Sequence, residues 1–271
     1  MDQFTKKVIE TPKPIGRHRY HKLKYNSGPL TEEEKAEVLA YEEGKRQQRA
    51  TTSQYFKRIN TENGPKEINY KDLKVKFAER FEEINARKFD LKGLEDINAL
   101  LWYFAKDEKF LSAKNVLKSI SKPAFEKGLL IVGDYGSGKS ASMNTLQSLF
   151  TNISKYSANK IVDTFESFED QEARGAYISR TKYKPAYFDD VKTEKEASNY
   201  GKHNLMKTII EERYNNKAVT FITCNYRPGR EQQKDVEDAL AEFGEKYGPR
   251  VYDRLFEMFN IIQFNGKSYR K

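Results

Sequence analysis

Four consecutive apolar residues, 129–132, lead directly into a glycine-rich segment, and this junction constrains the fold more than any other part of the chain. A short apolar run bounded by glycine indicates a buried strand, and residues 141–150 favour a helix after it. The segment between them has the spacing G-x-x-x-x-G-K-S, which is typical of a phosphate-binding loop. It consists of Gly133, Asp134, Tyr135, Gly136, Ser137, Gly138, Lys139 and Ser140. We therefore expect a strand, a loop and a helix that together bind the phosphates of a nucleotide.

This spacing has a physical mechanism. Glycines let the backbone curl so that successive N–H groups point at phosphate oxygens, while Lys139 reaches the outer phosphates and Ser140 offers its hydroxyl to Mg²⁺. The amino end of the following helix adds a partial positive charge. A chance glycine-rich turn would match the same spacing, but the flanking strand and helix favour nucleotide binding.

Strands and helices alternate after this loop. We expect strands over 153–157, 185–190 and 218–225, and helices over 158–173 and 197–214. Such alternation predicts an α/β fold, in which helices cover both faces of a parallel sheet. Ligands in these sheets bind at the carboxyl ends of the strands, so the phosphate-binding loop and the other strand ends should share one rim.

Three polar residues end the expected strands: Asp189 and Asp190 close one, and Asn225 closes the next. Phosphoryl transfer needs neutralised phosphate charge and an aligned water. We expect Asp189 to hold Mg²⁺ together with Ser140, and Asp190 to orient or deprotonate the attacking water. Asn225 would bind the same water or the terminal phosphate. The alternatives are an ordinary surface loop for the two carboxylates and a turn residue for Asn225.

Composition excludes disulfide-rich proteins and argues against membrane and secreted proteins. The chain has 271 residues and one cysteine, Cys224, which excludes an internal disulfide framework. No apolar run suits a membrane span, and the first residues lack the apolar core of a signal peptide. We expect a cytoplasmic protein without a membrane partner. Cys224 is expected in the core and His203 on a helix surface, because no Cys and His cluster has metal-ligand spacing.

The net charge of +9 is concentrated before the loop, and the first thirty residues hold many of the basic side chains. They favour an extended or disordered tail, which either binds nucleic acid or another polyanion or is simply solvated. Thr31 and Glu34 form a capping box that predicts a charged helix to about Arg49, either solvated or docked on a partner. Residues 51–66 have the composition of a linker.

Two further helices are expected before the loop, because apolar and aromatic residues of 70–84 and 94–104 recur at helical spacing. Such stripes are more often core than ligand pocket. The predicted organisation is a basic, partner-binding region over 1–66, a helical region that packs on the core over 67–124 and an ATPase domain over 125–271.

Two arginines near the end, Arg250 and Arg254, lie one helical turn apart and share a face. A short strand is expected after them, over 261–264. Exposed arginines are usually solvated. In an assembly of several copies, however, one of them could reach the nucleotide of a neighbour, where such a finger accelerates hydrolysis by roughly 10³ to 10⁵.

From residue 125 to the end, the chain resembles the DnaC-type bacterial helicase loaders and the IstB-type transposition ATPases, a branch of the AAA+ superfamily. The phosphate-binding loop and an ordered set of short segments carry the resemblance. These segments are Phe188-Asp189-Asp190-Val191, Thr193-Glu194, Glu212-Arg213, Thr223-Cys224-Asn225, Arg250-Val251-Tyr252-Asp253-Arg254-Leu255 and Ser268-Tyr269-Arg270.

The resemblance implies a P-loop AAA+ core that lacks a C-terminal helical lid, binds ATP and Mg²⁺, and assembles with copies of itself. It implies that Asn225 is the sensor 1 residue and Arg270 the sensor 2 arginine. Arg254 would be the arginine finger, with Arg250 as the fallback.

It also implies contacts with single-stranded DNA at aromatic and basic positions, because bases stack on aromatic rings and phosphates bind cations. Two clusters fit this description, and exposed loops are the alternative interpretation of both. The candidate residues are Tyr200, Lys202, Arg180 and Lys182.

The most specific function that the resemblance implies is an ATP-dependent helicase loader in DNA replication. It would bind single-stranded DNA and, through about its first 90 residues, a replicative hexameric helicase. A transposition helper that recruits a transposase shares the same core, and a nucleotide-gated adaptor with little turnover is the third alternative. Asp190 stands where a glutamate is commoner, which favours slow hydrolysis stimulated by DNA or a partner.

Overall fold

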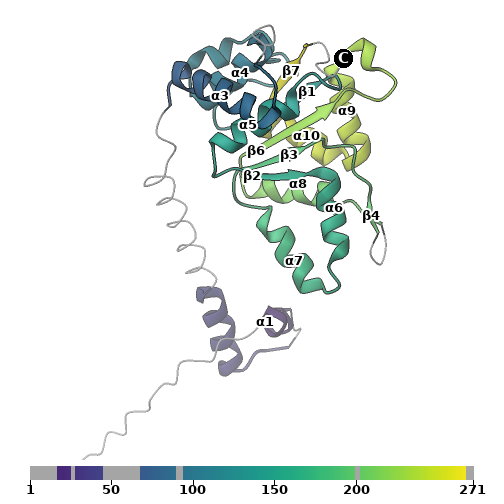
Figure 1. The fold of residues 1–271 in the computed structure, drawn as a ribbon. Coiled ribbons are helices and arrows are strands. Elements are labelled where there is room, and N and C mark those ends of the chain that lie inside the picture. The colour runs from purple at the N-terminus through teal and green to yellow at the C-terminus, as the bar shows by residue number, and fades with distance from the viewer. Residues whose placement is uncertain (1–16, 26–27, 45–67, 90–93, 199–201, 267–271) are drawn as a thin grey trace, which may run out of the picture. The chain divides into compact units, whose positions relative to one another are not determined.

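The computed structural model describes residues 17–25, 28–44, 68–89, 94–198 and 202–266 (Figure 1). The chain divides into two compact units, Met1–Lys66 and Glu67–Lys271. The second unit contains the phosphate-binding loop and a central sheet.

The first unit contains α1 (Arg17–Lys24) and a second helix over residues 32–44. The expectation of an extended or disordered tail is therefore wrong for α1. Arg19 Nε lies 2.9 Å from Glu37 Oε2, and the stacked rings of Tyr20 and Tyr41 have centroids 4.3 Å apart. A helix this short is marginal alone, so contacts with the second helix stabilise it.

The predicted capping box at the start of the second helix is confirmed. Thr31 N donates to Glu34 Oε2 at 2.9 Å, and Glu34 N donates to Thr31 Oγ1 at 3.3 Å. Two of the free N–H groups at the helix start are thus satisfied. The predicted helix end near Arg49 and the linker over 51–66 lie outside the described residues.

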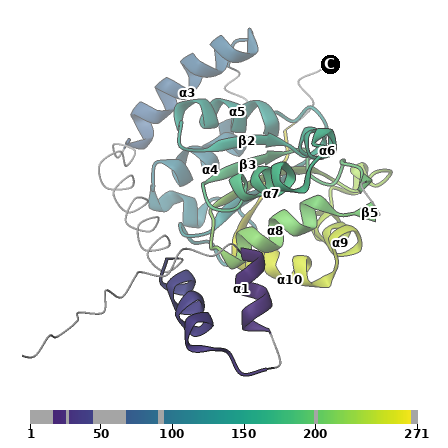
Figure 2. The same ribbon diagram turned by 90° about the horizontal axis from the view of Figure 1, so that it is seen from below.

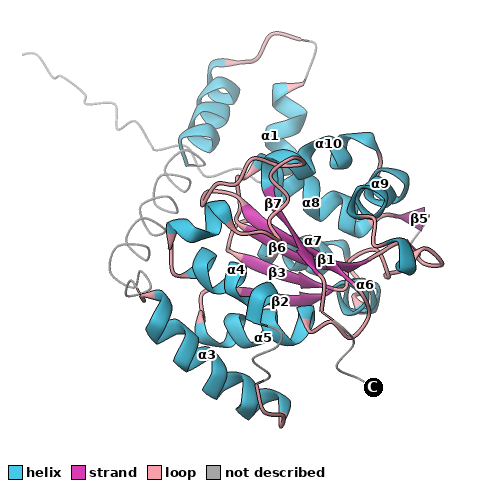
Figure 3. Ribbon diagram, turned by 90° about the horizontal axis from the view of Figure 1, so that it is seen from above, coloured by secondary structure: helices cyan, strands magenta, loops and turns pink. Residues whose placement is uncertain are grey.

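The second unit is built on five parallel strands in the order β2-β3-β6-β1-β7 (Figure 3). The strands are β1 (Gly128–Gly133), β2 (Ser154–Ser157), β3 (Ala186–Asp189), β6 (Thr220–Asn225) and β7 (Phe259–Phe264). The predicted α/β fold with a parallel sheet is confirmed. The phosphate-binding loop leaves the carboxyl end of β1, which lies between β6 and β7.

Successive side chains of β1 point to opposite faces of the sheet, and both faces are buried. Leu129 and Ile131 pack beneath α3 (Tyr70–Asn85), α4 (Leu94–Phe104) and α5 (Lys139–Leu149). Leu130 and Val132 pack on the helices of the other face. Those are α6 (Ala158–Ser167), α7 (Gln171–Arg180), α8 (Leu205–Asn215), α9 (Val236–Tyr247) and α10 (Pro249–Met258). The sheet is therefore the middle of three layers.

The helices α8 and α10 lie side by side on their face of the sheet (Figure 2). The short 3₁₀ helix η3 (Glu231–Gln233) and α9 precede α10. The helix α9 was not predicted, although it carries a buried apolar stripe at helical spacing, formed by Val236, Leu240, Phe243 and Tyr247.

Two predicted helices differ from the structure. The helix expected over 158–173 is interrupted between α6 and α7, where Asp170 caps α7 by accepting a hydrogen bond from Ala173 N. The helix expected over 197–214 begins only with α8. Its first part is instead an antiparallel pair, β4 (Ala197–Ser198) and β5 (Lys202–His203), so His203 lies on a strand rather than a helix.

The two helices expected before the loop are confirmed as α3 and α4, and a 3₁₀ helix, η2 (Glu108–Ser112), follows them. Phe77, Leu100 and Leu101 are fully buried, as the apolar stripes predict. Ile84 is an exception, because it is 41% exposed at the end of α3. None of the helices in the described part of the chain is long and apolar enough to cross a membrane.

Candidate nucleotide-binding site

The loop between β1 and α5 has the backbone that its glycines predict. Gly136 and Gly138 have φ values of 77° and 91°, in the left-handed region that other residues rarely adopt. Gly133 cannot carry a Cβ, because that atom would lie 2.7 Å from the carbonyl oxygen of Phe264 on β7. Helix α5 starts at Lys139 without a side-chain cap. Its first N–H groups are therefore available to an anion.

Lys139 is enclosed by the loop that precedes it. Its Nζ donates to the carbonyl oxygens of Gly133 and Asp134 at 2.9 and 2.7 Å, and to Asn225 Oδ1 at 3.0 Å. Burial lowers the pKa of Lys139 to about 8, although nearby carboxylates oppose the shift. The ammonium group is thus held among neutral acceptors that a phosphate could replace.

Asp189, at the end of β3, receives three hydroxyl groups on one oxygen. Its Oδ1 accepts from Ser140 Oγ at 2.6 Å, from the Tyr187 hydroxyl at 2.6 Å and from Thr223 Oγ1 at 2.7 Å. Burial and the adjacent carboxylate raise the pKa of Tyr187 well above its usual value, so its hydroxyl stays a donor. These donors fix the carboxylate beside Ser140, and hydroxyl and carboxylate oxygens are suitable ligands for Mg²⁺.

Asp190 is held next to Asn225. Asn225 Nδ2 donates to Asp190 Oδ1 at 2.9 Å, while the amide oxygen of Asn225 accepts from Lys139. The backbone of Asp190 is left-handed, with a φ of 57°, and Thr193 Oγ1 donates to its carbonyl oxygen at 2.7 Å. One amide side chain therefore bridges the lysine of the loop and the second carboxylate.

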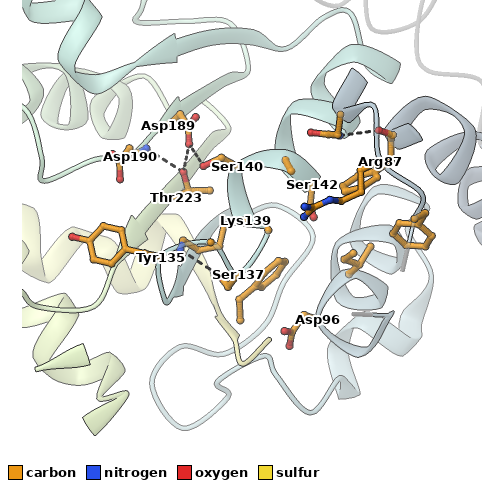
Figure 4. A pocket seen from close by; sticks show the side chains of 18 of the residues that line it. Arg87, Asp96, Tyr135, Ser137, Lys139, Ser140, Ser142, Asp189, Asp190 and Thr223 are labelled. Carbon is orange, nitrogen blue, oxygen red and sulfur yellow. Dashed lines mark hydrogen bonds between the residues drawn. The ribbon is translucent and has the colours of Figure 1, made fainter. Parts of the chain in front are cut away.

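A cavity of about 840 Å³ opens beside these groups (Figure 4). Typical small-molecule sites have volumes of about 300–1,000 Å³. Asp189 and Asp190 lie on one side of it, and Arg87 and Ser142 on the opposite side (Figure 4). Ser142 Oγ is buried and has no hydrogen-bond partner within the described residues, which leaves a polar atom for a ligand.

The wall away from the carboxylates comes from the end of α3, the segment after it and the start of α4. Its residues are Phe81, Asn85, Ala86, Arg87, Lys88, Phe89, Asp96 and Ile97. The rings of Phe81 and Phe89 lie edge to face, with centroids 5.4 Å apart. The aromatic stripe expected to be core therefore has two roles, because Phe77 is buried and Phe81 lines the cavity, where Phe89 from the segment after α3 joins it.

This wall and the hydroxyls of Tyr187 and Thr223 on Asp189 were not among the predicted parts of the site. A signal for the hydroxyls was present, because Tyr187 and Asp189 are two residues apart on one strand, as are Thr223 and Asn225 on the next. Residues two apart on a strand point to the same face. No comparable signal links α3 to the loop, since about fifty residues separate them.

Arg254 lies far from the loop of its own chain. Its guanidinium carbon is 4.4 Å from the ring centroid of Tyr214, in the last turn of α8. That turn leads into the amino end of β6, whereas the loop is at the carboxyl ends of the strands. Arg250 is exposed in the first turn of α10.

The candidate DNA-binding residues are only partly described. Arg180 is exposed at the end of α7, and Lys182 Nζ lies 3.1 Å from Glu212 Oε2. Lys202 contributes its backbone to β5. Tyr200 and Arg270 lie outside the described residues.

The strand order, counted along the chain as 2-3-4-1-5, and the loop after the first strand define an α/β fold with a phosphate-binding loop. Two solved structures are similar to this chain. The DnaC helicase loader has 20% identity, a TM-score of 0.47, and coverage of 69% of this chain and 100% of its own. DnaI has 18% identity, a TM-score of 0.42, and coverage of 66% and 87%. No protein-family model and no curated protein sequence matches.

Proposed function

We propose that this chain is an ATPase that binds ATP and Mg²⁺ in the cavity beside the phosphate-binding loop. The observation that carries the proposal is the connected set of polar groups around Lys139. Lys139 contacts Asn225, Asn225 contacts Asp190, and the neighbouring Ser140 contacts Asp189. Phosphoryl transfer requires a cation, a carboxylate and a hydroxyl close to the phosphates, so this connected set supports the proposal.

The phosphate oxygens would replace the carbonyl oxygens as acceptors for the Lys139 ammonium. They would also accept hydrogen bonds from the backbone N–H groups of the loop. The adenine base and ribose would lie in the cavity against the wall formed by Phe81, Arg87 and Phe89. Aromatic rings offer a base a stacking surface, and the unpartnered Ser142 hydroxyl offers it a hydrogen bond.

Ser140 and Asp189 fit a magnesium ion, because they place a hydroxyl and a carboxylate oxygen 2.6 Å apart at the phosphate end of the cavity. When bound, Mg²⁺ neutralises charge on the phosphates. Asp190 would accept a proton from the attacking water, and Asn225 would fix the position of Asp190.

Arg254 would act on the nucleotide of a second copy. Its position toward the amino ends of the strands supports this assignment, because the phosphates lie at the opposite edge of the sheet in the same chain. Nucleotide would then control assembly as well as supply free energy.

The particular role that we propose is helicase loading in DNA replication, with single-stranded DNA and a replicative hexameric helicase as partners. The ordered motifs from the loop to Arg254 support it, and the helix pair of the first unit offers a separate element for partner binding. A transposase partner would instead identify a transposition helper.

Substitution of Lys139 tests the core of the proposal. Lys139→Ala should weaken binding of a fluorescent ATP analogue at least about 100-fold, because charge-assisted contacts to the phosphates are lost. Lys160→Ala, at an exposed position of α6, is the matched control and should bind like the wild type. Unchanged binding by Lys139→Ala, with wild-type binding intact, would refute the site.

Co-purification tests the partner. The full chain should retain a hexameric replicative helicase, and a chain that lacks residues 1–66 should not. Retention of a transposase, with no helicase, would identify the alternative. ATP binding without turnover in the presence of DNA and either partner would favour the nucleotide-gated adaptor.

A further inference from the structure

Lys192, three residues after Asp189, combines two features that are unfavourable for a lysine. Its backbone has a φ of 84°, in the region that favours glycine. Its side chain is only 4% exposed, although lysines are rarely buried. Strain and burial that persist together at one residue beside a candidate active site point to a function.

The ammonium group of Lys192 is fully engaged. It donates to the main-chain oxygen of Asn225 at 2.9 Å, to that of Ala239 at 3.2 Å and to Glu242 Oε2 at 2.5 Å. Ala239 and Glu242 belong to α9, and Asn225 ends β6. A lysine has three N–H donors, and here each has an acceptor.

One of these contacts holds Asn225, which with Asp190 forms the pair that would position the attacking water in the proposed function. The side chain of Asn225 binds Asp190 and Lys139, while its carbonyl oxygen is bound by Lys192. Asp190 is two residues before Lys192 on the same short loop. Lys192 is therefore linked to Asp190 by the backbone between them and to Asn225 by a hydrogen bond.

The loop around Lys192 is fixed to α9 by further bonds. Its backbone N–H donates to Glu194 Oε2 at 3.0 Å and to the Tyr247 hydroxyl at 3.1 Å. Lys246 Nζ donates to its carbonyl oxygen at 2.5 Å. These hydrogen bonds therefore fix the loop that follows β3 relative to α9.

We propose that Lys192 is a positioning residue for hydrolysis, which aligns Asp190 and Asn225 against α9 with Glu242 as its anchor. The inference rests on the proposed ATPase function. Misplacement of a reacting group by about 1 Å can reduce a rate roughly 100-fold. Binding of nucleotide depends on the glycine loop and Lys139, which Lys192 does not contact directly, so the effect should fall on turnover.

Two substitutions at this position separate alignment from stability. Lys192→Gly removes the ammonium group and relieves the left-handed backbone, whereas Lys192→Met removes the charge and retains the backbone strain. Both should reduce kcat at least about 20-fold, with the Kd for ATP within about threefold of the wild type. Lys195→Met, an exposed lysine that pairs with Asp163 and Glu166, is the control and should leave kcat within twofold.

A double substitution tests the anchor. Glu242→Gln should reduce kcat about fivefold, and its combination with Lys192→Met should be no slower than Lys192→Met alone, because the two act through one contact. Melting temperatures should not follow the loss of turnover, since Lys192→Gly should melt at least as high as Lys192→Met.

The outcomes are distinguishable. An active wild type with Lys192→Gly and Lys192→Met both within twofold of its kcat would overturn the inference and leave the ATPase intact. A turnover loss that follows melting temperature across the variants would also overturn it. A wild type that binds ATP but never hydrolyses it contradicts the proposed hydrolysis and overturns the inference with it.

Discussion

The ammonium of Lys139 donates to Oδ1 of Asn225 at 3.0 Å, which joins the phosphate-binding loop to the end of the neighbouring strand β6. The ammonium group is shared between this amide and the carbonyl oxygens of Gly133 and Asp134. In the proposed site, an incoming phosphate would take over these contacts and release the amide oxygen. Under the proposed function, the amide of Asn225 would then respond to the filling of the phosphate site.

Nucleotide affinity should fall as the pH rises above about 8. The pKa of Lys139 is lowered to about 8 by burial, so the unliganded site loses its charge above that pH. The Kd for ATP should rise by up to tenfold per pH unit, as measured by calorimetry between pH 6.5 and 9.5. Binding near pH 8.5 should also take up a proton. An affinity that stays level to pH 9.5 would contradict the shift.

The same shift has a consequence for stability. Because the folded pKa lies below the usual 10.5, the unfolded chain binds more protons between pH 8 and 10.5. The contribution of Lys139 to the free energy of unfolding should therefore rise with pH across that interval. Urea titrations of the wild type and Lys139→Met should converge there, because the uncharged methionine lacks the pH-dependent cost.

Tyr187→Phe should weaken magnesium binding about tenfold with little change in the affinity for Mg²⁺-free nucleotide. The substitution removes one of the hydroxyls that orient Asp189, and loss of such an orienting partner typically costs 10–100-fold in metal affinity. Tyr156→Phe, the same change on β2, is the matched control. Titration of ATP binding against Mg²⁺ measures the effect, and equal curves for the two variants would exclude this role of Tyr187.

Arg254→Ala should abolish turnover that depends on protein concentration and leave nucleotide binding unchanged. If the arginine serves a second copy, a mixture of Arg254→Ala with Lys139→Ala should recover part of the activity that each lacks alone, because one interface then contains an intact lysine and an intact arginine. Arg250→Ala tests the fallback in the same assay. Absence of recovery together with full turnover of Arg254→Ala would exclude the finger.

Arg213→Met should lower the free energy of unfolding by about 3–5 kcal/mol, because buried carbonyl oxygens lose their donors. The guanidinium of Arg213 is fully buried and binds the carbonyl oxygens of Thr181, Lys184 and Val219 and the hydroxyl of Thr220. Burial lowers its pKa to about 10, so it stays charged at neutral pH. Arg180→Met, at an exposed site, should change urea stability by no more than about 0.5 kcal/mol.

Local sequence was sufficient for the centre of this molecule. The apolar run and the glycine spacing predict β1, its loop and α5, because the signal for each lies in neighbouring residues, although β1 itself pairs with the distant strands β6 and β7. The capping box of Thr31 and Glu34 is local in the same sense. The helix α9 was equally readable, since its apolar residues recur at helical spacing after the cap Asp235, and it was missed.

Contacts between distant residues decided the rest. Pairing with the helix over 32–44 stabilises α1, which has no strong signal of its own. The strand pair β4 and β5 replaces the start of a predicted helix. A short segment can form its backbone hydrogen bonds in a helix or in a strand pair, and contacts with neighbouring residues determine which of the two forms. The wall of the cavity brings the end of α3 beside the loop and α5 on one face of the sheet.

Local sequence patterns therefore predict a phosphate-binding loop after a buried strand in an α/β fold, and they indicate which polar residues end the other strands. The packing of distant elements brings Tyr187 and Thr223 to Asp189, Phe81 and Phe89 to the cavity and Lys192 to Asn225. The physical reason is that periodicity gives the face of each element, whereas the partner across that face depends on how all the elements pack.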